Sequence, residues 1–213
     1  VSILGGNARN GEGRFIIAEA DESDGSFLKL NSYLAVVTNI EDDHLDYYGT
    51  EENIYKAFKQ FLGNLVEGGK AILCVDNAKV KALAQEIDKA VITYGLEEAD
   101  YVAKDICYGV DGTTYKLYYK DEFITEVRLI VPGRHNVLNS VGAFVAAREM
   151  GIADETILKA LEQFGGAKRR FETKGKVNGV WVVDDYAHHP TEIEVTLKAA
   201  RQTQPKRLLC LFQ

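Results

Sequence analysis

The sequence predicts a mixed α/β protein in which a mostly parallel sheet with crossover helices is extended by a small antiparallel meander. Between residues 34 and 94, short apolar runs alternate with segments of helical periodicity, as in parallel strands joined by helices. From residue 101 to residue 131 the hydrophobic period is two, which is typical of antiparallel strands. Hydrophobic residues make up 46% of the 213 residues, enough for a full core.

The parallel part begins with two apolar runs that each end in acidic residues. We expect strands at residues 14–19, 34–38, 71–75 and 90–94, and helices at residues 51–65 and 78–87. Thr50 is the expected N-cap of the first helix, because its hydroxyl can accept a hydrogen bond from a free amide of the first turn. If the first two strands are parallel neighbours, their acidic ends meet at the edge where ligands bind in open α/β sheets.

Glycine-containing turns divide the second half of the chain. Asp111-Gly112 predicts a hairpin within the meander, and two helices are expected at residues 136–150 and 154–164. The glycine pair at residues 165–166 marks an expected domain boundary. Residues 1–166 then form a central domain, and residues 167–213 begin a second one. In the second domain we expect a hairpin at residues 171–184 with Asn178-Gly179 as its turn, a helix at 190–203 and a strand at 207–212.

Composition and charge exclude several classes of function. The net charge is −7 and the pI is near 5.2, whereas binding to nucleic acid or to an anionic membrane requires a basic face. The three cysteines are isolated, which disfavours zinc and disulfides and fits a reducing, cytoplasmic setting. No apolar run reaches the roughly 18 residues of a membrane helix. The chain lacks an initial Met and ends within an apolar run, so we expect a fragment of a longer protein.

Acidic residues and a histidine follow the first two predicted strands. Glu19 ends the first strand, and His44 lies within the acidic run that follows the second. Such a cluster is a candidate site for a cation or for phosphate transfer. Mg²⁺ prefers oxygen ligands, so Glu19 is the better ligand, while the imidazole of His44 suits Mn²⁺ or Zn²⁺. The alternative is a solvated acidic loop, because polar strand ends are common.

Amide side chains gather at the start of the predicted helix at residues 136–150. His135, Asn136 and Asn139 lie in the run P-G-R-H-N-V-L-N, with the two asparagines three residues apart on one helical face. An amide offers both a donor and an acceptor, which suits the edge of a nucleobase. Helix capping by asparagine is the alternative.

Two further charged segments flank the predicted hairpin of the second domain. Arg170 lies in a basic run at the expected hinge, where a guanidinium fits phosphate geometry; a basic surface turn is the alternative. The run D-D-Y-A-H-H-P-T-E at residues 184–192 follows an apolar strand and precedes a helix. There Asp185 can bind ribose hydroxyls and His188 can orient a small polar substrate. No G-x-x-x-x-G-K-[ST] phosphate loop occurs in the chain.

Taken together, these motifs resemble those of the Mur ligases, the ATP-dependent amino-acid ligases of peptidoglycan precursor synthesis. The resemblance covers nearly the whole chain and is carried by five runs in order: A-E-A-D-E-S-D-G-S-F, T-N-I-E-D-D-H-L-D, P-G-R-H-N-V-L-N, R-R-F and D-D-Y-A-H-H-P-T-E. It implies that the second domain is Rossmann-like. Within the family, the motifs are most similar to the branch that joins L-alanine to UDP-N-acetylmuramate.

The resemblance also implies roles for individual residues. It implies Mg²⁺ at Glu19 and His44, with His44 next to an acyl phosphate formed from ATP. Asn136, Asn139 and His135 would face the adenine, and Arg170 and Asp185 would contact the nucleotide. Tyr186 and His188 would lie near the incoming amino acid. The catalytic set is then His44, Glu19 and Arg170.

The resemblance leaves two alternative functions. A recycling ligase of the same family adds a whole murein tripeptide to the same sugar nucleotide, but it usually carries Phe where Tyr186 stands. A non-catalytic nucleotide-binding scaffold is the other alternative. Because the chain contains no phosphate loop, no UDP-sugar domain and only the start of the third domain, we expect it to have no ligase activity by itself.

Overall fold

The computed structural model describes residues 6, 8–109 and 112–212, and its main feature is a six-stranded sheet. The strands lie in the order β1-β2-β3-β4-β5-β6; the first four are parallel and the last three run antiparallel to one another. They are β1 (Leu34–Val37), β2 (Lys70–Cys74), β3 (Ala90–Gly95), β4 (Tyr101–Gly109), β5 (Gly112–Tyr119) and β6 (Glu122–Leu129). The predicted parallel sheet with an antiparallel meander is confirmed.

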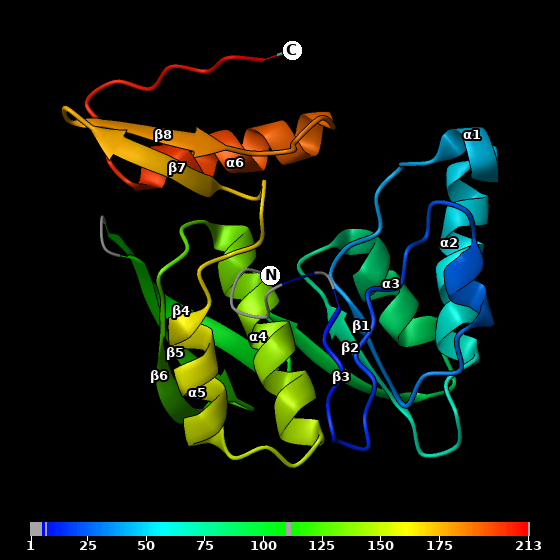
Figure 1. The fold of residues 1–213 in the computed structure, drawn as a ribbon. Coiled ribbons are helices and arrows are strands. Elements are labelled where there is room, and N and C mark those ends of the chain that lie inside the picture. The colour runs from blue at the N-terminus through cyan, green and yellow to red at the C-terminus, as the bar shows by residue number, and fades with distance from the viewer. Residues whose placement is uncertain (1–5, 7, 110–111, 213) are drawn as a thin grey trace.

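Helices cover both faces of this sheet (Figure 1). They are α1 (Leu45–Tyr48), α2 (Glu51–Gly63), α3 (Ala78–Glu86), α4 (Arg134–Glu149) and α5 (Asp154–Gln163), with a short 3-10 helix, η2 (Ser26–Lys29), before β1. One buried cluster joins α4 and α5 to the sheet around Tyr115 and Phe144, and the other joins α2 and α3 to it around Leu62 and Leu83. No helix among the described residues has the length and apolar character needed to cross a membrane.

Two local sequence signals, one at a helix end and one at a hairpin turn, are confirmed, whereas Asp111 of the expected Asp111-Gly112 turn lies outside the described residues. The hydroxyl of Thr50 accepts a hydrogen bond from the Asn53 amide at 3.2 Å and caps α2. Asn178 and Gly179 have φ angles of 52° and 77°. A two-residue hairpin turn of type I′ requires a positive φ at both central residues, which is why Asn-Gly marked this turn in the sequence.

A smaller unit follows the sheet and consists of β7 (Glu172–Val177), β8 (Val180–Asp184) and α6 (Pro190–Gln202). In Figure 1 this unit lies over the end of the larger unit at which α4 begins. The two units touch there, because a Cβ atom built on Gly133 would lie 3.1 Å from the Cβ of Ala199 on α6. The start of α4 and the last turn of α6 therefore lie in one region.

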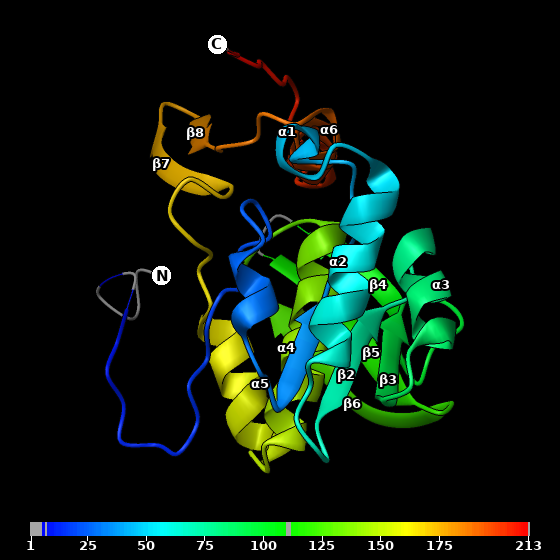
Figure 2. The ribbon, with the colours of Figure 1, turned by 90° about the vertical axis from the view of Figure 1, so that its right-hand side faces the viewer.

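Two expected strands do not form. Residues 14–19 have no regular secondary structure, and Ile16 and Ile17 are 96% and 83% exposed. Figure 2 shows this segment running apart from the sheet. Residues 207–212 are also irregular. A strand needs a neighbour for its backbone hydrogen bonds, and among the described residues neither segment pairs with one. The sheet therefore ends at β1, and Glu19 does not lie at the tip of an adjacent strand.

Candidate functional site

His44 occupies a strained position just after β1. Its φ of 55° is left-handed, which is uncommon for a residue with a side chain, and it is the residue that starts α1. The carboxylate of Asp43 holds it there by accepting the His44 backbone amide at 2.8 Å, and the imidazole Nε2 lies 3.8 Å from the same carboxylate. The ring is half-buried. Backbone strain of this kind is often found at functional sites, where the surroundings fix one side-chain direction.

The acidic turn after residue 19 packs against α1, beside His44. The Tyr48 hydroxyl donates to the Glu22 carbonyl, and a Cβ on Gly25 would lie 2.7 Å from the Tyr47 hydroxyl. Hydrogen bonds from Ser23 lower the pKa of Asp21, and the charge of His44 lowers it further. The acid whose pKa is affected by His44 is thus Asp21, which the sequence analysis did not single out. Glu19 is exposed and has no hydrogen-bond or ion-pair partner among the described residues.

Two other acids of the His44 run, Glu41 and Asp42, are held by residues that follow β2. Asp42 pairs with Lys79, which also lies 3.6 Å from Glu51, and Glu41 accepts from the Asn77 side chain at 3.3 Å. These contacts position the loop and leave His44 as its candidate functional side chain. Over residues 6, 8–109 and 112–212, no group of three or more His, Cys, Asp or Glu side chains could hold a metal ion by itself.

The start of α4 places the expected base-recognition residues at the contact between the two units. Asn136 donates its amide to the Pro132 carbonyl at 2.7 Å, so one of its donors is used locally, whereas Asn139 is exposed. His135 is half-buried, and its Nδ1 atom is buried with no hydrogen-bond partner among the described residues. Burial lowers the pKa of His135, while the nearby charge of Asp185 raises it, and the net pKa is below its ordinary value. Asparagine capping is not the reason for this motif, since Gly133 occupies the N-cap.

An ion pair fixes the start of α4 to the carboxyl ends of the parallel strands. Arg134 pairs with Asp76, whose side chain is only 11% exposed and follows β2. The other Asp76 oxygen accepts the Leu96 amide at 2.8 Å, just past β3. The amide-rich turn of α4 is therefore attached to the same sheet edge from which the His44 loop leaves.

Arg169 to Phe171 and the loop after β8 form one hydrogen-bonded unit. The Tyr186 amide donates to the Arg169 carbonyl at 2.8 Å. Asp185 accepts the Phe171 amide at 2.7 Å through one oxygen and the Ala187 amide at 2.8 Å through the other. Arg169 and Phe171 both have positive φ angles, 56° and 50°, so this turn is strained and held by its partners. Each Asp185 oxygen keeps a lone pair that can accept a ribose hydroxyl.

The side chains of this unit form a compact polar surface. The Arg169 guanidinium lies 4.4 Å from the ring centre of Tyr186, and the rings of Tyr186 and His188 are 5.2 Å apart at 60°. Nδ1 of His188 lies 3.0 Å from the Tyr186 carbonyl. The structure thus brings together Arg170, Asp185, Tyr186 and His188, and it places His135 close enough to Asp185 for their charges to interact.

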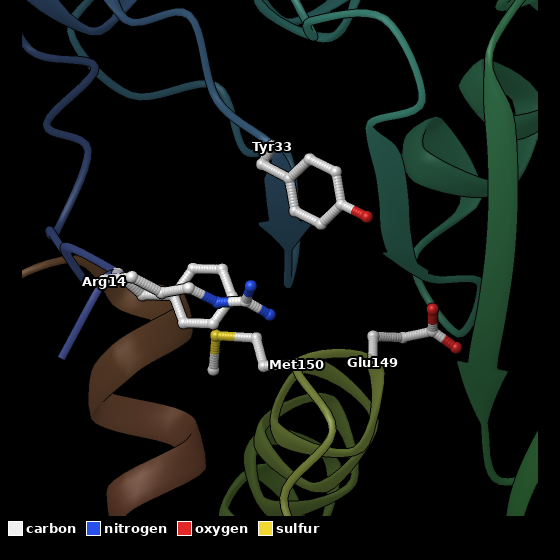
Figure 3. A pocket seen from close by; sticks show the side chains of 5 residues that line it. Arg14, Tyr33, Glu149 and Met150 are labelled. Carbon is white, nitrogen blue, oxygen red and sulfur yellow. The ribbon is translucent and has the colours of Figure 1, made fainter.

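A hollow of about 300 Å³ elsewhere in the chain is not part of this site (Figure 3). It is lined by Arg14, Phe15, Tyr33, Glu149 and Met150. Tyr33 precedes β1 and Glu149 ends α4, whereas the candidate site lies after β1 and at the start of α4. The hollow is therefore at the opposite end of these elements.

The fold agrees with the comparisons with known protein families. A model of the Mur ligase middle domain matches residues 6–147, and a model of the Mur ligase glutamate ligase domain matches residues 169–213. The first match alone covers more than half of the chain, and the chain belongs to the Mur ligase family.

Individual relatives and solved structures show how similar this chain is to particular Mur ligases. UDP-N-acetylmuramate–L-alanine ligases of Desulforamulus reducens and Pelotomaculum thermopropionicum are 49% and 47% identical over all of this chain, which covers 46% and 47% of their lengths. The crystal structure of the UDP-N-acetylmuramate-alanine ligase of Thermotoga maritima matches with a TM-score of 0.75 and 27% identity, over 86% of this chain and 41% of that one. A murein peptide ligase of Psychrobacter arcticus matches with a TM-score of 0.61 and 28% identity, over 83% and 36%. The chain spans about half the length of the curated relatives it matches.

Proposed function

We propose that this chain forms the nucleotide-binding part, and the start of the amino-acid-binding part, of a ligase that joins L-alanine to UDP-N-acetylmuramate. The observation that carries the proposal is the convergence of Arg170, Asp185, Tyr186 and His188 in one loop system beside the start of α4. The whole-chain similarity to ligases named for L-alanine supports the choice of substrate. Parts of both halves of such a site, nucleotide and amino acid, then lie on this chain, divided at the expected boundary near residue 166.

The chemistry proceeds through an acyl phosphate. The muramate carboxylate attacks the γ-phosphorus of ATP and ADP leaves; the amine of L-alanine then attacks the acyl carbon and phosphate leaves. Phosphoryl transfer depends mainly on positioning and on neutralising charge. In this proposal Arg170 neutralises phosphate charge and His44 lies against the acyl phosphate. Asn136, Asn139 and His135 hold the adenine, Asp185 holds the ribose, and Tyr186 and His188 orient the amino acid.

Glu19 and the acidic turn that follows it fit a magnesium ion that is shared with substrate. Glu19 is an exposed carboxylate without a protein partner among the described residues, and Asp21 is kept ionised by its lowered pKa. Mg²⁺ typically takes one or two protein carboxylates and completes its shell with water and phosphate oxygens, so a larger protein cluster is not needed. When bound, the ion neutralises charge on the phosphates. Glu19 is the proposed ligand, with His44 beside the ion; Mn²⁺ is an alternative ion because it accepts imidazole.

The test uses the full-length protein and measures ADP release. We expect release to require both UDP-N-acetylmuramate and L-alanine, in the presence of Mg²⁺. Release with murein tripeptide in place of L-alanine would instead assign the recycling reaction. Nucleotide binding without turnover on either substrate, unaffected by Glu19→Ala and His44→Ala, would show a non-catalytic scaffold.

A further inference from the structure

Glu192 occupies the centre of the loop system that carries Arg170 and His188. It lies in the first turn of α6, and one carboxylate oxygen, Oε2, accepts the backbone amides of His188 at 3.1 Å and His189 at 3.4 Å. The same oxygen lies 3.5 Å from Nδ1 of His188. The other oxygen, Oε1, accepts from the Arg170 guanidinium at 3.2 Å. Glu192 is thus the side chain that joins the Arg170 turn to the His188 loop.

A capping role accounts for only half of these contacts. Glu192 is the third residue of a capping box, in which its carboxylate satisfies the backbone amide of His189, the N-cap residue. That role uses Oε2 and explains why an acidic or amide residue stands here. It does not explain the contact of Oε1 with Arg170, which lies 22 residues earlier in the chain.

The charge of Glu192 is maintained in the folded protein. Burial raises the pKa of the Glu192 carboxyl, but the hydrogen bonds from His188, His189 and Arg170 outweigh this effect and the net pKa is lowered. The carboxylate is therefore ionised opposite Arg170. Arg170 keeps its remaining guanidinium N–H groups free for a ligand, since Glu192 is the acid with which it pairs among the described residues.

We propose that Glu192 is a positioning residue that acts through Arg170, holding the guanidinium in the direction needed for the nucleotide phosphates while fixing the His188 loop beside it. This inference rests on the proposed function for the role of Arg170. It assigns to α6 a residue that orders both halves of the site, nucleotide and amino acid, without touching either ligand. Small displacements of a positioning group are costly, because misplacement by about 1 Å can lower a rate by orders of magnitude.

Glu192→Gln separates positioning from capping. Glutamine is accepted at the third position of a capping box, so its side-chain oxygen can still receive the His188 and His189 amides. Its nitrogen then faces Arg170, and two donors oppose each other where the wild type has a charge-assisted hydrogen bond. Glu194→Gln is the matched control, because Glu194 lies on the same helix and pairs with Lys198, at 2.6 Å, on the exposed surface.

The experiment measures ADP binding and steady-state ligation in the full-length wild type and both variants, with thermal unfolding as a check on folding. We expect Glu192→Gln to unfold at the wild-type temperature but to lose roughly tenfold in affinity for ADP or in kcat/KM for ATP, with Glu194→Gln unchanged. In an Arg170→Ala background, Glu192→Gln should have no further effect, because its action passes through Arg170.

Three outcomes would overturn the inference. Glu192→Gln could match the wild type in both nucleotide measurements, which would leave only the capping role. Its effect could persist in full without Arg170. Alternatively, the wild type could fail to bind ADP, which would remove the proposed role of Arg170 together with the proposed function. A wild type that binds ADP but does not ligate would reject the ligase and still test Glu192 through binding.

Discussion

Replacing Gly133 with alanine tests whether the start of α4 depends on close contact between the two units. Gly133 has φ 106° and ψ 139°, a backbone conformation that essentially only glycine occupies. A Cβ there would lie 2.6 Å from Cε1 and 2.8 Å from Nδ1 of His135, and 3.1 Å from the Cβ of Ala199. The backbone strain alone costs about 1–3 kcal/mol, and the contacts that are too close must be relieved by moving the His135 ring and α6.

We therefore expect Gly133→Ala to destabilise the chain by about 3 kcal/mol, which lowers the unfolding temperature of a chain of this size by roughly 6–12 °C. Urea and thermal unfolding measure this, and ADP binding by the full-length variant should weaken because His135 is displaced. Gly63→Ala is the control: apart from its chain neighbours and the backbone of its own helix, no atom lies within 4 Å of its added Cβ, and alanine favours the helix there. A Gly133→Ala variant as stable as Gly63→Ala, with unchanged ADP affinity, would refute the reasoning.

Three further predictions concern the core, the pH dependence and the isolated chain. Tyr115→Phe removes the buried hydrogen bond of 2.8 Å between the Tyr115 and Ser140 hydroxyls, while Ser140 still donates to the Val137 carbonyl. Urea unfolding should therefore show a free energy of unfolding lowered by only about 1 kcal/mol. A decrease several times larger would contradict this prediction. The pKa of His135 is lowered in the folded protein, so as the pH falls the unfolded chain takes up the proton first. The free energy of unfolding of the wild type should therefore decrease as the pH falls through about 6.5, the ordinary pKa of histidine, and His135→Gln should weaken this pH dependence. The same pH dependence of stability in both proteins would count against the prediction. The 213-residue chain alone should release no ADP when it is incubated with UDP-N-acetylmuramate, L-alanine and ATP. ADP release that depends on both substrates would refute this prediction, because it would show that the chain catalyses ligation by itself.

The sequence predicts the regular elements well because their signals are local. The periodicity of residues 51–65, the Thr50 cap and the Asn178-Gly179 turn each depend on a few neighbouring residues, and all three are confirmed. The strand expected at residues 14–19 has the right composition but lacks a pairing partner among the described residues, and composition cannot supply one. The same holds for residues 207–212.

The candidate site was predicted less completely than the fold, because its supporting contacts join distant segments. Motifs marked His44, Arg170 and Asp185, but nothing local showed that Asp185 accepts the Phe171 amide or that Asp76 anchors Arg134. Asp21 and Glu192 were not singled out, although both lie inside the quoted motifs. Their role is visible only from the residues they contact.

The acidic residues of these motifs divide into those that hold the backbone and those left free for a ligand, and this division predicts how each responds to substitution. Asp43 accepts the His44 amide, and Asp185 accepts two backbone amides. Replacing either by alanine leaves strained turns without their partners, so loss of activity there includes loss of structure. Glu19 has no such partner among the described residues, so if it binds magnesium as proposed, its removal should weaken magnesium and nucleotide binding with little effect on folding. The motif alone does not distinguish these acids, whereas the hydrogen bonds predict that substitution disturbs the backbone at Asp43 and Asp185 and not at Glu19.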